Sequence, residues 1–567
     1  MGSRSRAWIR AAFVVVALLA LAGVAGVAAA DGTGQTVAPT DGTLADTHIQ
    51  ACAAEPPADY ADPDSGTDGV VGWVDGYWYD EPLDIDISDG LTPDELDVLA
   101  ARTAARFEAM RCLDADGTPP VEIQTREEFA AELGEAFGNV SEAERLFDNA
   151  MFEAMLAVSS GADSIEVREA NRAATTGGFY NFQEDRIVIV SDSPDSLLID
   201  EEVLAHEVGH AIQDQRFNLS RFDRDTSDLD IGTQGLIEGD VDRVEYQYLQ
   251  ACEEELWEEP CLQEDFGEGG GGGQEEPASW ALYFNNFQPY SDGPTFIEHV
   301  YEQGGWEAVN AVYDNPPRSS AEVINPETYG EFERENLTVP DRSTGEWERL
   351  TFDDGPNYDV IGQAGITATF MQVPYETREQ DDIIIQPQSF LNLGPEGEVD
   401  EFDPLEYDHP ETDGWRNDRL YVYRNGNETG VVWKLAWANS TEAAQFATAY
   451  RELVAFRGGE RHPDYENVYT FENATEWDLT VAVETRGDRV VIVTAPGVDD
   501  LTAVHDVALV EADEGAADDG ETADDSADND DTAGDGAGDT DADGPGFGVV
   551  VAVAGLVGAL LLARRVT

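Results

Sequence analysis

The chain has 567 residues, and its 41% hydrophobic content is sufficient for a sizeable buried core. It carries 118 acidic and 31 basic residues, for a formal net charge of -87, and its single lysine is Lys434. Such a surface repels nucleic acid and anionic lipid, so we exclude nucleic-acid binding. The acidic residues are spread through every segment, including those with apolar periodicity, which indicates a folded protein adapted to very high salt.

The first 30 residues carry the parts of a secretion signal. Basic residues come first, an apolar run spans residues 11–27, and three alanines precede Asp31. Arg4 and Arg6 are not adjacent, so the twin-arginine motif is absent and ordinary secretion is favoured. We therefore expect residues 1–30 to be removed on export and residues 31–84 to form an N-terminal extension.

Four cysteines allow three pairings, and an exported chain with an even number most simply forms two disulfides. Proximity in sequence favours Cys252 with Cys261 and leaves Cys52 with Cys112. No two cysteines have C-x-x-C spacing, which disfavours a cysteine zinc site.

Helix and strand patterns follow one another from residue 92 onward. In the first half they predict helices at 92–110, 127–137, 142–158 and 196–215, and strands at 121–123 and 186–190. We interpret Phe179 to Val190 as an edge strand, because zinc peptidases bind an extended substrate along such a strand shortly before the zinc-binding helix.

A flexible glycine loop at Gly269 to Gly273 and a helix at 295–312, broken at Gly304 and Gly305, come next. From residue 418 the patterns predict a small α+β unit, with strands at 420–423, 430–437, 468–471, 479–484 and 489–493 and helices at 441–456 and 499–510. The predicted fold class is α+β, with a metallopeptidase-like domain at residues 85–345 and an α+β domain at residues 346–510.

The segment LLIDEEVLAHEVGHAIQDQRF holds an HExxH motif. One helical turn separates His206 from His210, so both imidazoles leave the same face and can reach one zinc ion. Glu207 sits beside the first ligand, where its carboxylate can take a proton from water, and we assign it as the general base.

A catalytic zinc needs a third protein ligand. The metzincin pattern is excluded, because Gln213 and Arg216 occupy its glycine and histidine positions. Glu238, on a second amphipathic helix, is the favoured ligand, and Asp242 one turn later can accept the N–H of a ligating histidine. Asp240, or an acidic residue between Asp223 and Asp230, remains an alternative ligand.

The C-terminal end combines a stalk with a short apolar segment. Residues 511–544 contain almost no large apolar residue and cannot form a core. Pro545-Gly546-Phe547, the apolar run 548–563 and Arg564-Arg565 follow, and residues 545–567 resemble the tripartite sorting signal of haloarchaeal surface proteins. That resemblance implies an archaeosortase that removes the helix and attaches a lipid; a plain membrane anchor is the alternative. Either way the protein is expected at the cell surface, as suits a glycoprotein with six N-x-S/T sequons, at Asn139, Asn218, Asn336, Asn427, Asn439 and Asn473.

Residues 85 to 510 resemble a poorly characterised family of secreted, gluzincin-like haloarchaeal surface proteins. The segments LAHEVGHAIQDQRF and GLIEGDVDRVEY resemble its two zinc-binding helices, and PPRSSAEVINPETY, GWRNDRLYVYRNG and VVWKLAWANSTEAAQFATAY resemble its later blocks. The resemblance implies a peptidase-like fold and zinc. The family's His-Pro-Glu element corresponds here to Asn325-Pro326-Glu327, and the family's Gly-Glu helix start corresponds to Gly362-Gln363.

We therefore expect a secreted zinc metallopeptidase with one zinc ion held by His206, His210 and Glu238 and a protein or peptide as its substrate. A catalytically inactive binding or envelope protein is the alternative, and a zinc-stabilised structural module is disfavoured because Glu207 suits chemistry. The residue that stabilises the oxyanion is left open among four candidates on helices, namely Tyr246, Tyr248, His299 and Tyr301.

Overall fold

The computed structural model describes twelve stretches of the chain. These are residues 14–17, 52–63, 69–85, 90–191, 199, 201–254, 256–257, 259–262, 277–376, 384–394, 397–471 and 476–512. The predicted glycine loop, stalk and sorting signal and the sequon at Asn473 lie outside them. The architecture is α+β, as predicted. Within the described stretches, none of the helices has the length and apolar character needed to cross a membrane.

Capping boxes begin the first three helices, because each is preceded by Ser or Thr with Glu three residues later. Thr92, Thr125 and Ser141 are the capping residues. The elements of this part are the hairpin β2 (Trp73–Val74) and β3 (Tyr77–Trp78), then α3 (Pro93–Arg111), β4 (Val121–Thr125), α4 (Arg126–Phe137), α5 (Glu142–Ala154) and α6 (Ser164–Thr175). Helix α6 was not predicted.

The predicted single edge strand from Phe179 to Val190 is wrong, because the chain turns back on itself there. Strand β5 (Thr176–Asn181) and strand β6 (Arg186–Ser191) form an antiparallel hairpin. Asn181 ends β5, since its side chain accepts hydrogen bonds from the backbone of the next turn, and Asp185 completes the turn with φ 52°. Strand β6 is interior, between β5 and the parallel β4.

The outer edge of β5 pairs with a segment from the N-terminus of the chain. Strand β1 (Val14–Ala17) lies antiparallel to β5, with Val16 opposite Gly178. It belongs to the predicted secretion signal and lies against the zinc-motif helix α7 (Glu201–Phe217). This edge of the sheet therefore accepts an extended strand.

Four further helices follow α7 in the chain: α8 (Ser227–Glu253), which packs on α7, and α9 (Trp280–Val312), α10 (Ser320–Ile324) and α11 (Gly362–Glu376), which pack on α8. Helices α8 and α9 touch backbone to backbone, since a Cβ on Gly239 would lie 2.3 Å from Gly293. Helix α9 begins at Trp280, earlier than the predicted residue 295, and includes two prolines. The predicted break at Gly304 and Gly305 is present. Short 3-10 turns lie at Leu219–Arg221, Pro326–Thr328 and Pro387–Phe390.

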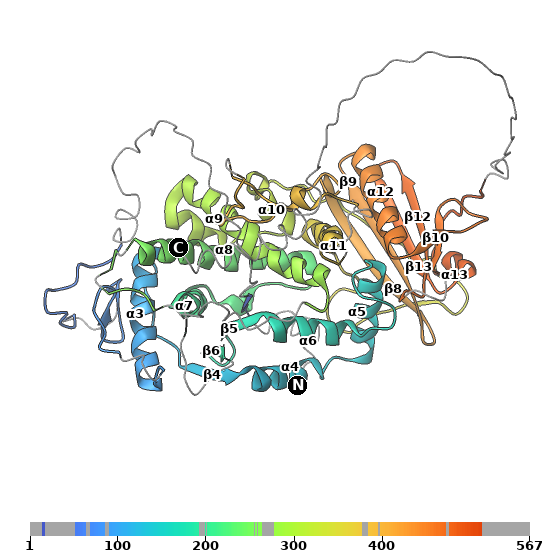
Figure 1. The fold of residues 1–567 in the computed structure, drawn as a ribbon. Helices are drawn as coiled ribbons and strands as arrows, with labels where there is room; N and C mark the ends of the chain where they lie inside the picture. Colours follow the sequence, from blue (N-terminus) through green and yellow to red (C-terminus); the bar gives the residue numbers. More distant parts are fainter. Residues whose placement is uncertain are drawn as a thin grey trace, which may run out of the picture.

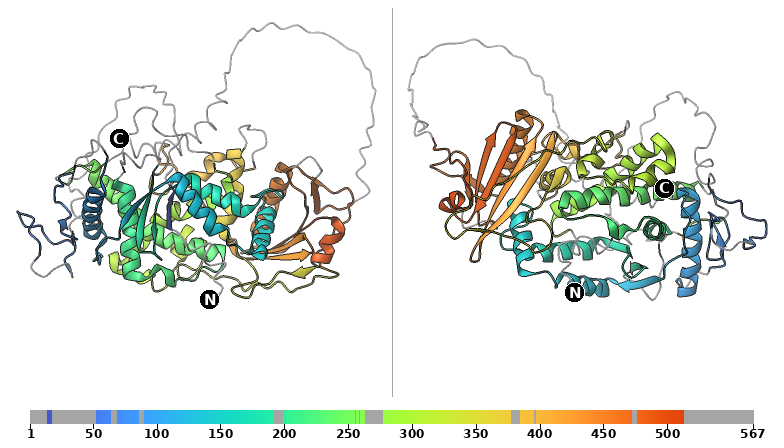
Figure 2. Two further views of the ribbon diagram at one scale, coloured as in Figure 1. Left: turned by 90° about the horizontal axis from the view of Figure 1, so that it is seen from below. Right: turned by 180° about the vertical axis from the view of Figure 1, so that it is seen from behind.

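The second predicted unit forms a seven-stranded antiparallel sheet in the order β10-β11-β12-β13-β9-β8-β7. It lies at the opposite end of the molecule from α3 (Figures 1 and 2). Its elements are β7 (Glu348–Arg349), β8 (Trp415–Asn425), β9 (Glu428–Trp437), α12 (Ser440–Phe456), β10 (Gly459–Arg461), β11 (Val468–Phe471), β12 (Thr480–Arg486), β13 (Arg489–Ala495) and α13 (Val498–Val504).

One apolar core spans both predicted domains. Phe147 of α5, Phe284 of α9, Met371 of α11 and Trp433 of β9 belong to the same buried cluster. The Tyr450 hydroxyl of α12 donates to a backbone carbonyl at the end of α5, 2.6 Å away. The sheet is therefore packed onto the zinc-motif region rather than joined to it by a linker.

Candidate metal centre

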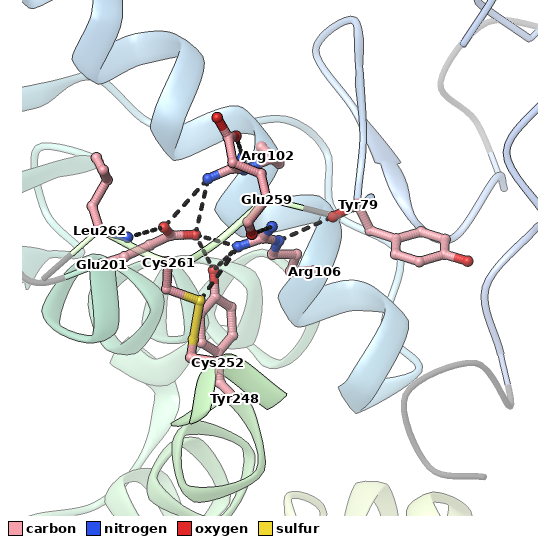
Figure 3. Close-up of a disulfide and its surroundings, with 9 residues drawn as sticks. All are labelled: Tyr79, Arg102, Arg106, Glu201, Tyr248, Cys252, Glu259, Cys261 and Leu262. Carbon is pink, nitrogen blue, oxygen red and sulfur yellow. Dashed lines mark hydrogen bonds and ion pairs between the residues drawn. A yellow bond between two sulfur atoms is a disulfide. The ribbon is translucent and has the colours of Figure 1, made fainter. Parts of the chain in front are cut away.

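The start of α7 is fixed by a buried carboxylate (Figure 3). Glu201 is 0% exposed and accepts hydrogen bonds from Arg106 at 2.7 Å and from the Tyr248 hydroxyl at 2.5 Å. Burial alone would raise the pKa of Glu201, but the charges of Arg106 and Arg102 outweigh it and the pKa is lowered. Glu201 therefore stays ionised and ties α7 to α3.

Both predicted disulfides, Cys52–Cys112 and Cys252–Cys261, are present. The second joins the end of α8 to residues 259–262, which contact Glu201 (Figure 3). The backbone N–H of Leu262 donates to the Glu201 carboxylate at 2.9 Å, and the Leu262 carbonyl accepts from the backbone N–H of Glu201 at 2.9 Å. The disulfide thus ties the end of α8 to a segment that is hydrogen-bonded to the start of α7.

The three predicted zinc ligands lie together. The Nε2 atoms of His206 and His210 are 2.8 Å apart, and they lie 3.3 Å and 3.2 Å from Oε2 of Glu238. Donor atoms at about 2.0–2.1 Å from one zinc ion in tetrahedral geometry are separated by roughly 3.3 Å. The two distances to Glu238 match those between ligands of one zinc ion, whereas the two nitrogens lie closer together.

The outer nitrogen of each histidine is held by an acceptor. Nδ1 of His206 lies 2.6 Å from Oε2 of Glu245 and 3.2 Å from Oδ1 of Asp242. Asp242 was the predicted partner, and Glu245, which the sequence reasoning missed, is the closer one. Glu245 lies seven residues after Glu238, on the same helical face, and this spacing is the signal that was available.

Nδ1 of His210 lies 3.0 Å from Oε1 of Gln213. The Gln213 amide nitrogen donates to the backbone carbonyl of Ile237 at 2.9 Å, so its oxygen is an acceptor and Nδ1 of His210 carries the proton. In a neutral His210 ring, Nε2 is then an acceptor, and it faces Nε2 of His206 and Oε2 of Glu238. Glu238 Oε2 is buried and has no hydrogen-bond partner among the described residues. Two imidazole nitrogens and one carboxylate oxygen converge here and could hold a metal ion, and this donor set suits zinc.

The carboxylates that were considered as alternative ligands make other ion pairs and hydrogen bonds. Asp240 is paired with Arg111 at 2.6 Å and accepts from the Tyr313 hydroxyl at 2.6 Å. Between Asp223 and Asp230, Asp228 pairs with Arg334 and accepts from two serines, and Asp230 pairs with Arg224. Glu238 is therefore the carboxylate that meets the histidines.

Glu207 lies buried beside the edge strand. Both of its carboxylate oxygens are buried, the backbone of Tyr180 lies close enough to hydrogen-bond the carboxylate, and a Cβ on Gly178 of β5 would lie 3.3 Å from Oε1. Burial raises the pKa of Glu207 well above its usual range, and the nearby charge of Glu238 raises it further. A carboxyl group in this environment is suited to take up and release a proton.

Tyr290 of α9 is the tyrosine at the centre, and the sequence reasoning missed it. Its ring stacks on His206 with centroids 6.3 Å apart, and its hydroxyl hydrogen-bonds Glu238. Burial and then the charges of Glu238, Asp242 and Glu207 raise its pKa, so it remains a neutral donor. No local pattern marks it, because α9 reaches the centre only through tertiary packing.

The four earlier candidates for the oxyanion position have other partners. Tyr248 donates to Glu201, Tyr246 packs on Phe402, Tyr301 lies under Arg243, and His299 contacts Gln303. The two positions that depart from the resembled family also lie elsewhere: Asn325 caps the end of α10, and Gln363 donates to Asp408.

Two segments match known sequence families. Residues 348–505 match a domain of unknown function, DUF8575, and residues 544–566 match the PGF-CTERM motif. No curated protein and no solved structure matches the chain. The PGF-CTERM motif marks secreted archaeal proteins that are processed by an archaeosortase and anchored at their C-terminus. This protein is accordingly a secreted, C-terminally anchored archaeal surface protein.

Proposed function

We propose that this surface protein is a zinc-dependent, gluzincin-like peptidase, with His206, His210 and Glu238 as ligands and Glu207 as general base. The convergence of three lone-pair donors at 2.8–3.3 Å beside the buried carboxyl of Glu207 carries the proposal. A purely structural zinc site would use its fourth position for another protein ligand. Here the ligands have a buried glutamate, Glu207, beside them that can accept a proton.

Bound zinc would supply a Lewis acid that polarises a peptide carbonyl and lowers the pKa of water. Glu207 takes a proton from the attacking water and delivers it to the leaving amine nitrogen. The Tyr290 hydroxyl, held beside Glu238 as a neutral donor, hydrogen-bonds the carbonyl oxygen as negative charge develops there. Glu245 and Asp242 hold the His206 ring in the tautomer that leaves Nε2 unprotonated.

The pairing of β1 with β5 supports a peptide as the substrate. An extended segment on this edge runs antiparallel to β5, passes Gly178 and therefore lies beside Glu207. Backbone hydrogen bonds to an exposed strand provide affinity that does not depend on side-chain identity. Export with loss of residues 1–30 would leave this edge open to another chain.

The test is a Glu207→Gln variant of the exported protein, with Glu202→Gln in the first turn of α7 as its matched control. Casein hydrolysis in high salt with zinc added should fall by about 10²–10⁴ in Glu207→Gln. The zinc content should stay at one ion per chain, and Glu202→Gln should retain activity. Equal hydrolysis by wild type and Glu207→Gln would refute the peptidase mechanism.

Metal analysis distinguishes the two ways in which the peptidase proposal can be wrong. A wild-type protein that holds one zinc ion but cleaves no protein or peptide would be the inactive binding protein. A protein without zinc at saturating metal would show that the three lone pairs are not a zinc site.

A further inference from the structure

A hollow of about 950 Å³ lies between α8, α9 and residues 400–408. Arg243 is the one basic residue of its lining among the described residues, and its Nε atom lies 2.5 Å from Glu298. Six acidic side chains line the hollow, namely Asp292, Glu298, Asp400, Asp403, Glu406 and Asp408. Apart from Glu298, none of these carboxylates has a basic side chain within 4.0 Å in the described part of the chain. The hollow therefore carries uncompensated negative charge.

Two of these carboxylates are held inside the protein. Asp292 is 6% exposed, and Asp403 accepts hydrogen bonds from the hydroxyls of Ser291 at 3.0 Å and Thr295 at 3.3 Å. Burial raises the pKa of Asp292 well above its usual range, and the charge of Asp403 raises it further. Burial likewise raises the pKa of Asp403 to about 7. Glu201 is buried too, but two arginines lower its pKa. No cation of the described chain does the same for Asp292 and Asp403.

A buried amide oxygen lies at the same wall of the hollow. Gln288 of α9 is 0% exposed, and its amide nitrogen donates to Oδ2 of Asp292 at 2.8 Å. Its Oε1 atom is buried and has no hydrogen-bond partner among the described residues. The side chain points toward the hollow, because it reaches a carboxylate that lines it. The groups left free at this wall are acceptors, so they suit a ligand that carries N–H donors and a positive charge.

The spacing of these acceptors favours an organic cation over a metal ion. A metal ion needs several oxygens around one point. Among the described residues, three donor atoms of acidic or histidine side chains lie within 4.8 Å of one another only around His206. The aromatic rings of Tyr246 and Phe402, whose centroids are 5.2 Å apart, also line the hollow. Apolar surface beside carboxylates suits the long methylene stem and charged end of an arginine or a lysine.

The hollow lies close to the metal centre along α8. Tyr246, which lines the hollow, follows Asp242 by one helical turn, which is about 5.4 Å along the axis. The side chains of Asp242 and Glu245 are 15% and 11% exposed, so the centre reaches the surface on this side. An extended peptide advances by about 3.3 Å per residue. A substrate residue about two to four positions from the cleaved bond can therefore reach the hollow.

We propose that this hollow binds the side chain of an arginine or a lysine in the peptide that the metal centre cleaves. The inference rests on the proposed peptidase function and adds a substrate class to it. The cationic end of the side chain lies between Asp292 and Asp403 and donates to Oε1 of Gln288. The methylene stem packs on Phe402. The bound side chain supplies the positive charge that the two buried carboxylates lack.

The first experiment measures peptide binding without cleavage, with the zinc-loaded Glu207→Gln protein in high salt. The probes are fluorescent alanine-rich peptides in which one arginine is moved along the sequence. Each is paired with a peptide that has citrulline at that position, because citrulline has the shape of arginine without its charge. At the best position the arginine peptide should bind about 10-fold more tightly, the effect of one charge-assisted hydrogen bond. Equal binding of both peptides at every position would overturn the inference.

The same pair of peptides tests the two buried carboxylates. Asp292→Asn and Asp403→Asn, each made in the Glu207→Gln protein, keep the size of the side chain and remove its charge. Each should reduce the preference for arginine to about 2-fold or less, and the second variant decides if the first folds poorly. Glu307→Gln is the matched control, because Glu307 is exposed on α9 and does not line the hollow. An unchanged preference in both aspartate variants would contradict the inference.

Hydrolysis by the wild-type protein separates this inference from the peptidase proposal. Equal kcat/KM for arginine and citrulline peptides at every position would refute the role of the hollow and leave the peptidase proposal intact. A preference for arginine in binding, without any hydrolysis, would refute the peptidase proposal and support the cation site. Free arginine amide or calcium ions that bind at the hollow as tightly as the peptide would identify a small cation as the ligand and overturn the inference.

Discussion

The interior around α7 and α8 is held by charges, whereas the interior of the seven-stranded sheet is apolar. Arg102, Arg106, Arg111, Glu201 and Asp240 are all at most 1% exposed near the metal centre. The buried face of the sheet presents residues such as Trp433, Leu435 and Ile492. Directional bonds fix each side chain at one angle, while apolar packing fixes volume and tolerates small shifts. The charged interior is therefore the one that can orient metal ligands, at a high desolvation penalty.

The largest expected effect comes from removing the metal. Chelation should abolish casein hydrolysis, and stoichiometric zinc should restore it. On the proposal that zinc binds only the folded centre, removing it from about 1,000 times its Kd should lower stability by about 4 kcal/mol. Hydrogen exchange should show faster opening of α7 and α8 than of β9 and β13. Equally accelerated hydrogen exchange in the helices and in the strands would show that the metal does not stabilise α7 and α8 in particular.

Arg111→Met should destabilise the protein by about 3–5 kcal/mol, because it leaves Asp240 buried without its partner. Chemical denaturation measures this effect. Arg342→Met is the control, since its pair with Asp506 is exposed and worth about 0–1 kcal/mol. Similar losses for both variants would mean that the buried pair has no special role.

Tyr290→Phe removes only a hydroxyl and should lower kcat by about 10²–10³ with little change in zinc content. Tyr301 lies on the same helix as Tyr290, with its ring under Arg243 of α8, and the variant Tyr301→Phe should keep wild-type kcat. Steady-state kinetics on one fluorogenic peptide compares them. A Tyr290→Phe enzyme with normal kcat would assign the oxyanion to another group.

Glu245→Gln should weaken zinc binding by about 10–100-fold, because the amide orients the His206 ring less well than a carboxylate. Competition with a zinc chelator gives the affinity. Glu253→Gln, at the exposed end of the same helix, controls for a general effect of charge removal. Unchanged affinity in Glu245→Gln would leave Asp242 as the sole partner that matters.

The smallest effect is expected within the sheet. Ile492→Val should cost about 0.5–1.5 kcal/mol, because it deletes one buried methyl group, and it should not change zinc affinity. Thermal denaturation and the same chelator competition test both statements. A loss of zinc affinity here would show that the sheet helps to position the centre.

Local patterns predicted much of this molecule. The HExxH spacing placed both histidines on one helical face, and the elements from β8 to β13, apart from the short strand β10, followed from alternation and turn residues. The edge strand was misread because two short strands separated by a tight turn were taken as one run. The first half of α9 was missed because Pro289 and Pro294 normally end a helix.

The sequence by itself determined the helical spacing of His206 and His210, indicated the export signal, and favoured the disulfide pairs and Glu238, since these depend on composition and distance along the chain. Tertiary structure decided which side chains complete the centre. Tyr290 and the strand edge beside Glu207 come from elements distant in sequence, and the pairing of Asp240 with Arg111 excluded the nearest rival ligand. Long-range packing brings such groups together, and no local pattern records it.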